Sequence, residues 1–307
     1  MLAAEAAGTL NLNSYMRARN LLAGLLLTPA LLPAQSVGKM LGDDVKNFGG
    51  DVWAVWTSPF RATPQGWLTT GLMVAGAAAM SPLDDNVDRW MVRNEGNAAW
   101  SSIKALREGG EFFSGKYVTP AAGLALVYSL ATKDKKIQEG LFGCAASYVS
   151  GSVVRNYVMY YLVGRERPDS SRDDAIDSPP AAEGDQYSFT FPGKKQWGMH
   201  SMPAGHAANI MACATFLNNR FDMGLVEPAL YALTAGIGVG RLVDRRHWTS
   251  DTFLGMAFGY AIGREVAKRS LVRANEGGTG GAAAAALSGA YFNPTKHGIT
   301  VGWKTTF

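Results

Sequence analysis

Apolar residues gather into six stretches of helical length, which short polar joints separate. The stretches are rich in alanine and glycine and contain few of the alternating β-branched residues that are typical of strands. They are Trp67–Met80, Tyr117–Thr132, Leu141–Gly164, Pro203–Leu217, Pro228–Gly240 and Phe253–Gly263. The pattern predicts an all-α protein, a bundle of about five or six core helices.

Two segments outside these stretches carry turn-forming residues. Residues 36–66 combine aromatic side chains with prolines, so we expect an irregular or short helical arm there. Residues 169–199 contain three prolines, several glycines and many acidic side chains, which predicts one long loop between two helices. Loops longer than roughly 12–15 residues in compact domains are usually functional. We therefore predict a lid that is mobile without ligand and orders over a bound one.

The pattern changes again near the C-terminus. Residues 275–286 have the sequence NEGGTGGAAAAA, which is typical of a flexible linker. Beyond this segment Ile299, Val301 and Trp303 alternate with small or polar residues, and residues 293–298 suit a turn. We expect a helical domain at 36–270, followed at 271–307 by a linker and a small β-hairpin.

Residues 1–35 have the features of an export signal. Arg17 and Arg19 precede an almost wholly apolar run, Leu21–Leu32, and a small residue stands directly before Gln35. This order is typical of a secretory signal peptide, although a buried N-terminal helix is the alternative. We predict a signal peptide whose natural start is Met16. The mature chain is then expected in the periplasm or on the outer face of the inner membrane.

The remaining stretches are poor candidates for membrane spans. Only Leu141–Gly164 approaches the roughly 20 residues that a span needs, and Arg155 interrupts it. The mean hydropathy of −0.02 is low for a protein with several spans. We expect a soluble or membrane-associated protein rather than an integral one.

The net charge and the two cysteines limit which binding partners are expected. The net charge is +4, and no Lys/Arg cluster is interleaved with aromatics, which argues against nucleic acid. An anionic small molecule or a lipid headgroup suits this mildly basic chain. Cys144 and Cys213 stand in apolar stretches without C-x-x-C spacing, which favours two buried thiols over a disulfide and argues against a metal site. The oligomeric state stays open.

Three short segments place cationic or imidazole side chains near helix ends. The first, Gly164–Pro168, ends an apolar helix with arginines that can direct paired donors at a phosphate. The second, Pro203–His206, opens a helix where a glycine lets amides approach an anion and a histidine can donate a proton. The third has the pattern Arg241-x5-His247-x3-Asp251. On one helix, residues four apart share a face, so Asp251 could fix the tautomer of His247.

Together these segments resemble the signature of the type 2 phosphatidic acid phosphatase superfamily, which includes bacterial acid phosphatases and vanadium haloperoxidases. The family pattern is Lys-x6-Arg-Pro, then Pro-Ser-Gly-His, then Ser-Arg-x5-His-x3-Asp. The matching residues here are Arg167-Pro168, Gly205-His206 and Arg241, His247 and Asp251, within roughly residues 84–264. The resemblance implies a metal-independent phosphohydrolase that cleaves phosphate monoesters or diphosphates.

The resemblance also implies a role for each matching residue. His247 would be the nucleophile that forms a phosphohistidine, Asp251 would orient it, and His206 would be the general acid. The phosphate-binding groups would be Arg167, Arg241 and the Gly205 amide. No cofactor is expected, because phosphoryl transfer in such a site depends mainly on positioning and charge stabilisation.

Three positions depart from the family pattern. Tyr160 occupies the lysine position, Ala204 replaces the serine of the second block, and Gly240 replaces the serine of the third. Tyrosine can offer the phosphate only one neutral hydrogen bond. Losing a charged contact in a desolvated site costs on the order of 2–4 kcal/mol of transition-state stabilisation. The candidates to replace the missing charge are Arg155, Arg165, Lys194 and Lys195.

Two other functions stay open from the sequence. A vanadate-dependent haloperoxidase would hold vanadate on His247, and an envelope phospholipid-binding protein would have lost catalysis through Tyr160 and Ala204. The substrate can be a phosphorylated lipid or a small phosphoester, with a membrane surface as a potential partner. Of the other histidines, His200 is expected to border the site and His297 to be solvated.

Overall fold

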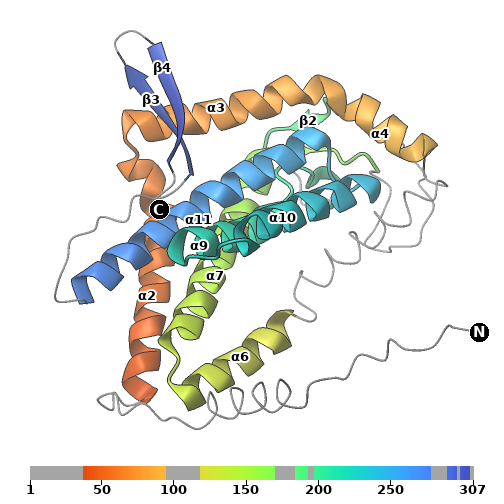
Figure 1. Cartoon of the computed structure of the whole chain (residues 1–307). Helices are drawn as coiled ribbons and strands as arrows, with labels where there is room; N and C mark the ends of the chain where they lie inside the picture. The colour runs from red at the N-terminus through yellow and green to blue at the C-terminus, as the bar shows by residue number, and fades with distance from the viewer. Residues whose placement is uncertain are drawn as a thin grey trace, which may run out of the picture. The chain divides into compact units, whose positions relative to one another are not determined.

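The computed structural model describes residues 37–94, 118–169, 184–192, 197–277, 289–295 and 298–304 (Figure 1). The motif residues all belong to one compact unit, which begins at Leu41. The predicted signal peptide, Lys194, Lys195 and His297 lie outside the described residues.

Helices make up most of the described chain, which confirms the predicted all-α class. Most of the described residues in each of the six apolar stretches are helical. The helices are α2 (Val37–Thr57), α3 (Pro64–Met80), α4 (Asp84–Arg93), α6 (Val118–Thr132), α7 (Lys135–Val154), α8 (Tyr160–Leu162), α9 (Gly205–Arg220), α10 (Val226–Val243) and α11 (Thr249–Gly277). A π-helical segment, Arg155–Met159, joins α7 to α8. The predicted C-terminal hairpin is also present, as β3 (Gly289–Thr295) paired with β4 (Gly298–Lys304).

Two boundaries differ from the sequence prediction. Residues 36–66 do not form an irregular or short arm, because α2 alone is 21 residues long. Val52 and Val55 of α2 pack into the buried core with Phe216 and Val266, and such packing stabilises helices that local composition does not reveal. At the other end, α11 continues to Gly277 rather than ending near residue 270.

The core forms where α9 packs against α7, α10 and α11 (Figure 1). The contact between α9 and α11 depends on glycines spaced four residues apart along α11. A Cβ atom at any of these glycines would overlap a backbone carbonyl of α9 or of the residue directly before it. The facing pairs are Gly255 with Ala204, Gly259 with Ala208, and Gly263 with Ala212. The two backbones therefore approach closely, which fixes the first turn of α9 against the start of α11.

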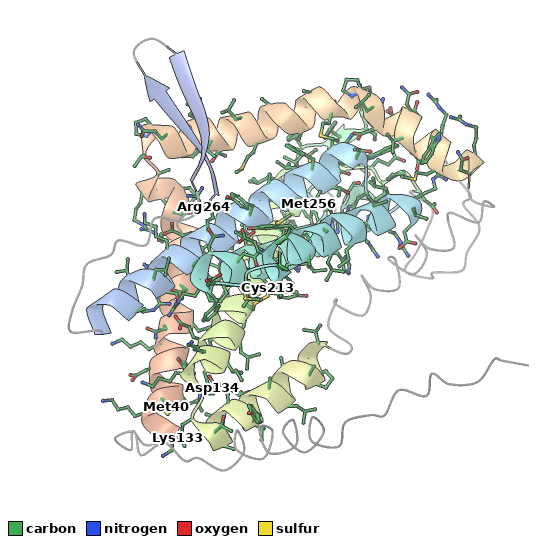
Figure 2. The ribbon with its side chains drawn as sticks, viewed as in Figure 1. Met40, Lys133, Asp134, Cys213, Met256 and Arg264 are labelled. Atoms are coloured by element: carbon green, nitrogen blue, oxygen red, sulfur yellow. A yellow bond between two sulfur atoms is a disulfide. The ribbon has the colours of Figure 1, made fainter. Side chains whose placement is uncertain are left out.

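The two cysteines form a disulfide, so the prediction of two buried thiols is wrong. Cys144 on α7 and Cys213 on α9 are bonded, and their Cα atoms are 4.5 Å apart (Figure 2). Helices can approach this closely only across small side chains, and Gly143 and Ala146 line this part of α7. The two cysteines are 69 residues apart. The sequence alone does not show that their helices are neighbours.

The long loop after the first motif is held at several points. Its strand β2 (Phe189–Thr190) pairs antiparallel with β1 (Gly164–Arg165). The Gly184 amide also donates to the Pro168 carbonyl at 2.9 Å. Residues 170–183 and 193–196 lie outside the described residues. The described part of the predicted lid is therefore attached to the first motif by backbone hydrogen bonds.

Among the described helices, none is both long enough and apolar enough to cross a membrane.

Candidate active site

Backbone hydrogen bonds join the three motif segments into one site. The segment that ends α8, the segment that leads into α9 and the turn between α10 and α11 lie side by side. The bonds run from Arg167 N to Gly198 O (2.8 Å), Ser201 N to Arg165 O (3.1 Å), Asp169 N to Arg245 O (3.2 Å) and Ala204 N to Asp251 O (3.0 Å). The three segments are thus held in register by their main chains before any side chain contributes.

His247 is buried, with 3% of its surface exposed, and one of its ring nitrogens is fixed. Its Nδ1 lies 2.6 Å from the carbonyl oxygen of Ser201. A carbonyl oxygen only accepts hydrogen bonds, so Nδ1 carries the proton and Nε2 of the neutral ring keeps its lone pair. Burial lowers the pKa of His247 well below its usual value, and the guanidinium groups of Arg167 and Arg241 lower it further. His247 is therefore neutral at physiological pH.

The carboxylate of Asp251 does not accept the His247 Nδ1 proton, which the spacing of the two residues suggested, because this proton goes to the Ser201 carbonyl. α11 begins at Thr249, so His247 precedes the helix and the two residues do not share a helical face. The carboxylate of Asp251 instead accepts the Ser201 hydroxyl (2.5 Å) and the Trp248 amide (3.0 Å). Its effect on His247 is indirect, because it holds the residue whose carbonyl accepts the His247 proton.

A buried ion network surrounds Asp251. Arg165 is fully buried and donates to Asp251 at 2.5 Å and to Asp84 at 2.8 Å. Ser250 completes the network, since its amide and hydroxyl both donate to Asp84. The five N–H groups of Arg165 are all used, because the remaining donors go to the Gln186 carbonyl and to Ser250. Arg165 therefore has no donor left for a phosphate, although the sequence made it a candidate phosphate-binding residue.

His206 lies in the first turn of α9, directly after Gly205. The first amides of a helix have no partner within the helix, and Ala204 provides no side-chain cap for them. An anion can therefore use these amides, supported by the partial positive charge of the helix end. Burial lowers the pKa of His206 to about 3, and neighbouring guanidinium groups add to this effect. They belong to Arg241, Arg155, Arg167 and Arg246.

Arg167 and Arg241 converge on the two histidines. Both are almost fully buried, at 6% and 5% exposed, and both lower the pKa of His206 and of His247. The Nη2 of Arg167 donates to the His200 carbonyl at 3.1 Å. Nη1 of Arg241 lies 3.3 Å from the carboxylate of Asp244. The structure therefore brings together the predicted nucleophile, the predicted acid and both predicted phosphate-binding arginines.

The turn that delivers His247 has a strained residue at its centre. After α10, the Arg246 amide donates to the Arg241 carbonyl at 3.2 Å and the Arg245 amide to the Leu242 carbonyl at 2.9 Å. This is the Schellman pattern, in which glycine usually occupies the left-handed position. Arg245 takes that position here, with φ 52°. Its guanidinium pairs with the Asp88 carboxylate at 2.8 Å, which holds the turn in place.

Tyr160, at the family's lysine position, is buried and neutral. Its hydroxyl donates to the Pro203 carbonyl at 3.4 Å, and its ring stacks on His200 with centroids 4.5 Å apart. Burial raises the pKa of the Tyr160 hydroxyl above its usual value. His200 does border the site, as expected. Tyr160 packs under the segment that leads into α9 and adds no charge to the site.

Several residues that build the site were not found from the sequence. Asp84, Asp88, Ser201 and Ser250 all form hydrogen bonds with residues of the motif segments. Asp84 and Asp88 lie in a short polar joint between apolar stretches, and a single serine carries no recognisable pattern. Within the described residues, no group of three or more His, Cys, Asp and Glu side chains is arranged to hold a metal ion.

A helical bundle that collects two neutral histidines and several buried arginines around a helix N-terminus has the features of a phosphoryl-transfer enzyme. The PAP2 superfamily model matches residues 140–272, which include every motif residue. This match confirms the family resemblance that the three motifs predict. It supports a phosphatase of that superfamily.

One curated relative adds to this picture. The lipid A 1-phosphatase of Porphyromonas gingivalis is 37% identical to this chain over 68 residues. The match covers 21% of this chain and spans only 15% of the length of that relative. No solved structure matches the chain significantly.

Proposed function

We propose that this protein is a phosphohydrolase that removes phosphate from a phosphorylated lipid through a phosphohistidine on His247. The observation that carries the proposal is the state of the His247 ring. Its Nδ1 proton is held by the Ser201 carbonyl, while burial and two arginines keep the ring neutral. Nε2 is then a fixed, unprotonated nucleophile beside cationic groups that favour a phosphate.

The proposed reaction has two steps. Nε2 of His247 attacks phosphorus, the N–P bond forms, and the bond from phosphorus to the leaving oxygen breaks. His206 donates a proton to that oxygen and becomes neutral. In the second step, His206 accepts a proton from water, the resulting hydroxide attacks phosphorus, and the N–P bond breaks to release inorganic phosphate. Arg167, Arg241 and the first amides of α9 stabilise the charge on the transferring group in both steps.

The low pKa of His206 has a consequence for the substrate. In the empty site the surrounding arginines hold its pKa at about 3, so His206 is neutral near pH 7. A bound phosphate offsets the arginines, because its negative charge favours the protonated imidazole. A phosphate monoanion can also bring the proton that His206 then passes to the leaving oxygen. The general acid is therefore charged only when substrate is present.

A lipid substrate is favoured by the surface next to the site. The segment that contains Tyr160 exposes apolar or aromatic side chains on both sides of this residue. They are Tyr157 (71% exposed), Val158 (45%), Tyr161 (44%) and Leu162 (61%). Exposed apolar groups beside a phosphate-binding site suit an amphiphilic substrate at a membrane surface. The matching relative, a lipid A 1-phosphatase, agrees with this substrate class.

We also propose that the protein acts outside the cytoplasm. Disulfides persist in oxidising compartments such as the bacterial periplasm and are rare in the cytosol. The bond between Cys144 and Cys213 therefore supports the export that the N-terminal sequence predicts. Edman sequencing of the mature protein is expected to begin near Gln35. A mature chain that begins at Met1 contradicts the proposal.

Turnover measured with two substrates tests the function. Purified protein is assayed with phosphatidic acid in detergent micelles and with para-nitrophenyl phosphate, with and without vanadate. We expect hydrolysis that vanadate inhibits and that is faster on the lipid, with His247→Ala as the inactive control. Halide oxidation that depends on vanadate identifies a haloperoxidase instead. Binding of the lipid phosphate without any turnover identifies a non-catalytic protein.

A further inference from the structure

The site lacks the lysine of the family pattern, and the residue in its position does not replace the charge. Tyr160 is neutral, and its hydroxyl donates to the Pro203 carbonyl. Arg165, a second candidate, has all five donors engaged by protein acceptors. Phosphoryl transfer depends on positive charge around the transferring group. Another cation of this chain is therefore needed if the site is active.

Arg155 reaches the site from outside the three motifs. It begins the π-helical segment Arg155–Met159, and π-helical turns inside helices are rare and frequently occur at functional sites. The guanidinium lies 5.9 Å from the centre of the Tyr160 ring. Its positive charge adds to the lowering of the His206 pKa that burial causes, and it partly offsets the rise that burial causes in the pKa of Tyr160. Arg155 is thus among the cations that act on the general acid.

The guanidinium of Arg155 has a donor without a protein acceptor. Its Nε donates to the Asn156 side chain at 3.0 Å. Its Nη1 is buried and has no hydrogen-bond partner among the described residues. A buried donor that is left unpaired costs roughly 1–3 kcal/mol, and a bound anion or a water molecule can satisfy such a group. An anion bound at the first turn of α9 would satisfy this donor.

The absence of a side chain at Gly205 leaves room for the Arg155 guanidinium beside the first turn of α9. A Cβ atom on Gly205 would overlap Nη1, Cζ and Nε of Arg155. The side chain therefore lies directly against the backbone of Gly205, whose amide is expected to bind phosphate. Gly205 has a second role in this chain, because it makes room for a cation as well as for the anion.

We propose that Arg155 is a phosphate-binding residue that supplies the positive charge that the family's lysine supplies from the position of Tyr160. The proposal rests on the phosphohydrolase function proposed above. Arg155 carries this charge about one and a half helical turns before Tyr160, at the start of the π-helical segment. Tyr160 becomes a packing residue that supports the segment leading into α9.

Three variants test this proposal. Arg155→Gln removes the charge, Arg155→Lys keeps it, and Arg264→Gln is the control. Arg264, labelled in Figure 2, stacks on Tyr260 of α11 at 5.8 Å, as Arg155 does on Tyr160, but it does not lie against Gly205. We expect Arg155→Gln to lower kcat/KM by about 10²–10³-fold and to weaken inhibition by vanadate similarly. Arg155→Lys retains at least ten times more activity than Arg155→Gln, and Arg264→Gln stays within about twofold of wild type.

Phosphate binding, measured by titration calorimetry, gives a readout that needs no turnover. Wild type and Arg264→Gln bind inorganic phosphate, and Arg155→Gln binds it at least tenfold more weakly. If Arg155→Gln matches Arg264→Gln in turnover and in phosphate affinity, or if Arg155→Lys loses as much as Arg155→Gln, the proposal is wrong. Inactive wild-type protein that still needs Arg155 to bind phosphate contradicts only the proposed function. Wild-type protein that neither turns over substrate nor binds phosphate contradicts both proposals.

Discussion

The two histidines of the site differ in how they are held. His247 has its Nδ1 fixed by the Ser201 carbonyl, whereas His206 lies in the first turn of α9 and faces four arginines. A fixed, neutral ring suits a nucleophile. A ring whose proton affinity rises when an anion binds suits an acid that acts only on bound substrate. The surroundings of each ring thus support the division of roles that we propose.

The dependence of activity on the leaving group tests whether His206 is the general acid. We expect His206→Ala to hydrolyse para-nitrophenyl phosphate at a substantial rate, because a good leaving group needs little protonation. The same variant loses about 10²–10⁴-fold more activity on an alkyl phosphate. Steady-state kinetics on both substrates checks this. Equal losses on the two substrates contradict the assignment of His206 as the general acid.

Two neighbouring aspartates allow a buried ion pair that supports the site to be compared with an exposed ion pair on the surface. Asp84 is buried and binds Arg165 and Ser250, whereas Asp85 forms an exposed ion pair with Arg89. Removing one partner of a buried pair costs roughly 3–5 kcal/mol, and an exposed pair contributes about 0–1 kcal/mol. We expect Asp84→Ala to lower the free energy of unfolding by several times more than Asp85→Ala. Urea denaturation of both variants tests this, and equal effects contradict it.

At the scale of single residues, the sequence predicts which residues form the site better than it predicts their contacts. The identities of His206, His247, Arg167 and Arg241 follow from the motifs, and the structure brings these residues together. The spacing of His247 and Asp251 suggested a direct contact, but the helix starts two residues after His247. A spacing of four predicts a shared face only inside a helix. The start of α11 is not apparent in the local pattern.

At the scale of elements, the approach of α11 to α9 positions the site. The Ala204 amide donates to the Asp251 carbonyl, and this contact needs the glycines of α11 at the crossing. The apolar stretches predicted these helices but not their pairing. Gly255, Gly259 and Gly263 are four residues apart, and the same spacing occurs in many helices without such a contact. Long-range pairing depends on both partners, so one segment alone does not reveal it.

A pair of glycine variants tests this crossing. A Cβ atom at Gly259 would overlap the Ala208 carbonyl, whereas one at Gly123 on α6 meets no atom within 4 Å. We expect Gly123→Ala to stabilise the protein by up to about 1 kcal/mol, since alanine favours helices over glycine. Gly259→Ala forces the helices apart, so we expect it to destabilise the protein by about 1–3 kcal/mol and to lower phosphatase activity. Thermal denaturation measures both effects, and a neutral Gly259→Ala variant contradicts the account.

At the scale of the whole molecule, the two long-range features that fix the bundle escaped sequence analysis. One is the disulfide between α7 and α9, and the other is the network that links Asp84, Arg165 and Asp251 across more than 160 residues of sequence. The helical class, the hairpin and the family were predictable because they depend on local patterns. The disulfide and the network depend on which helices become neighbours, and that is a property of the folded chain.

The two neutral histidines make the stability of the protein depend on pH. The unfolded chain binds protons at both histidines near pH 6.5, whereas in the folded protein the pKa of His206 is about 3 and that of His247 is also lowered. The unfolded state thus binds more protons below pH 6.5, and stability falls as pH decreases towards 3. Each histidine contributes up to about 1.4 kcal/mol per pH unit. Urea denaturation between pH 4 and pH 7 is expected to show a smaller slope for His206→Gln. An unchanged slope contradicts the lowered pKa.

The most direct measurement is to trap the covalent intermediate. The protein is mixed with substrate, quenched in alkali to preserve phosphohistidine, digested and analysed by mass spectrometry. The account predicts phosphate on His247 in wild type and in His206→Ala supplied with para-nitrophenyl phosphate, and none in His247→Ala. Phosphate trapped on His206, or hydrolysis that continues in His247→Ala, would contradict it.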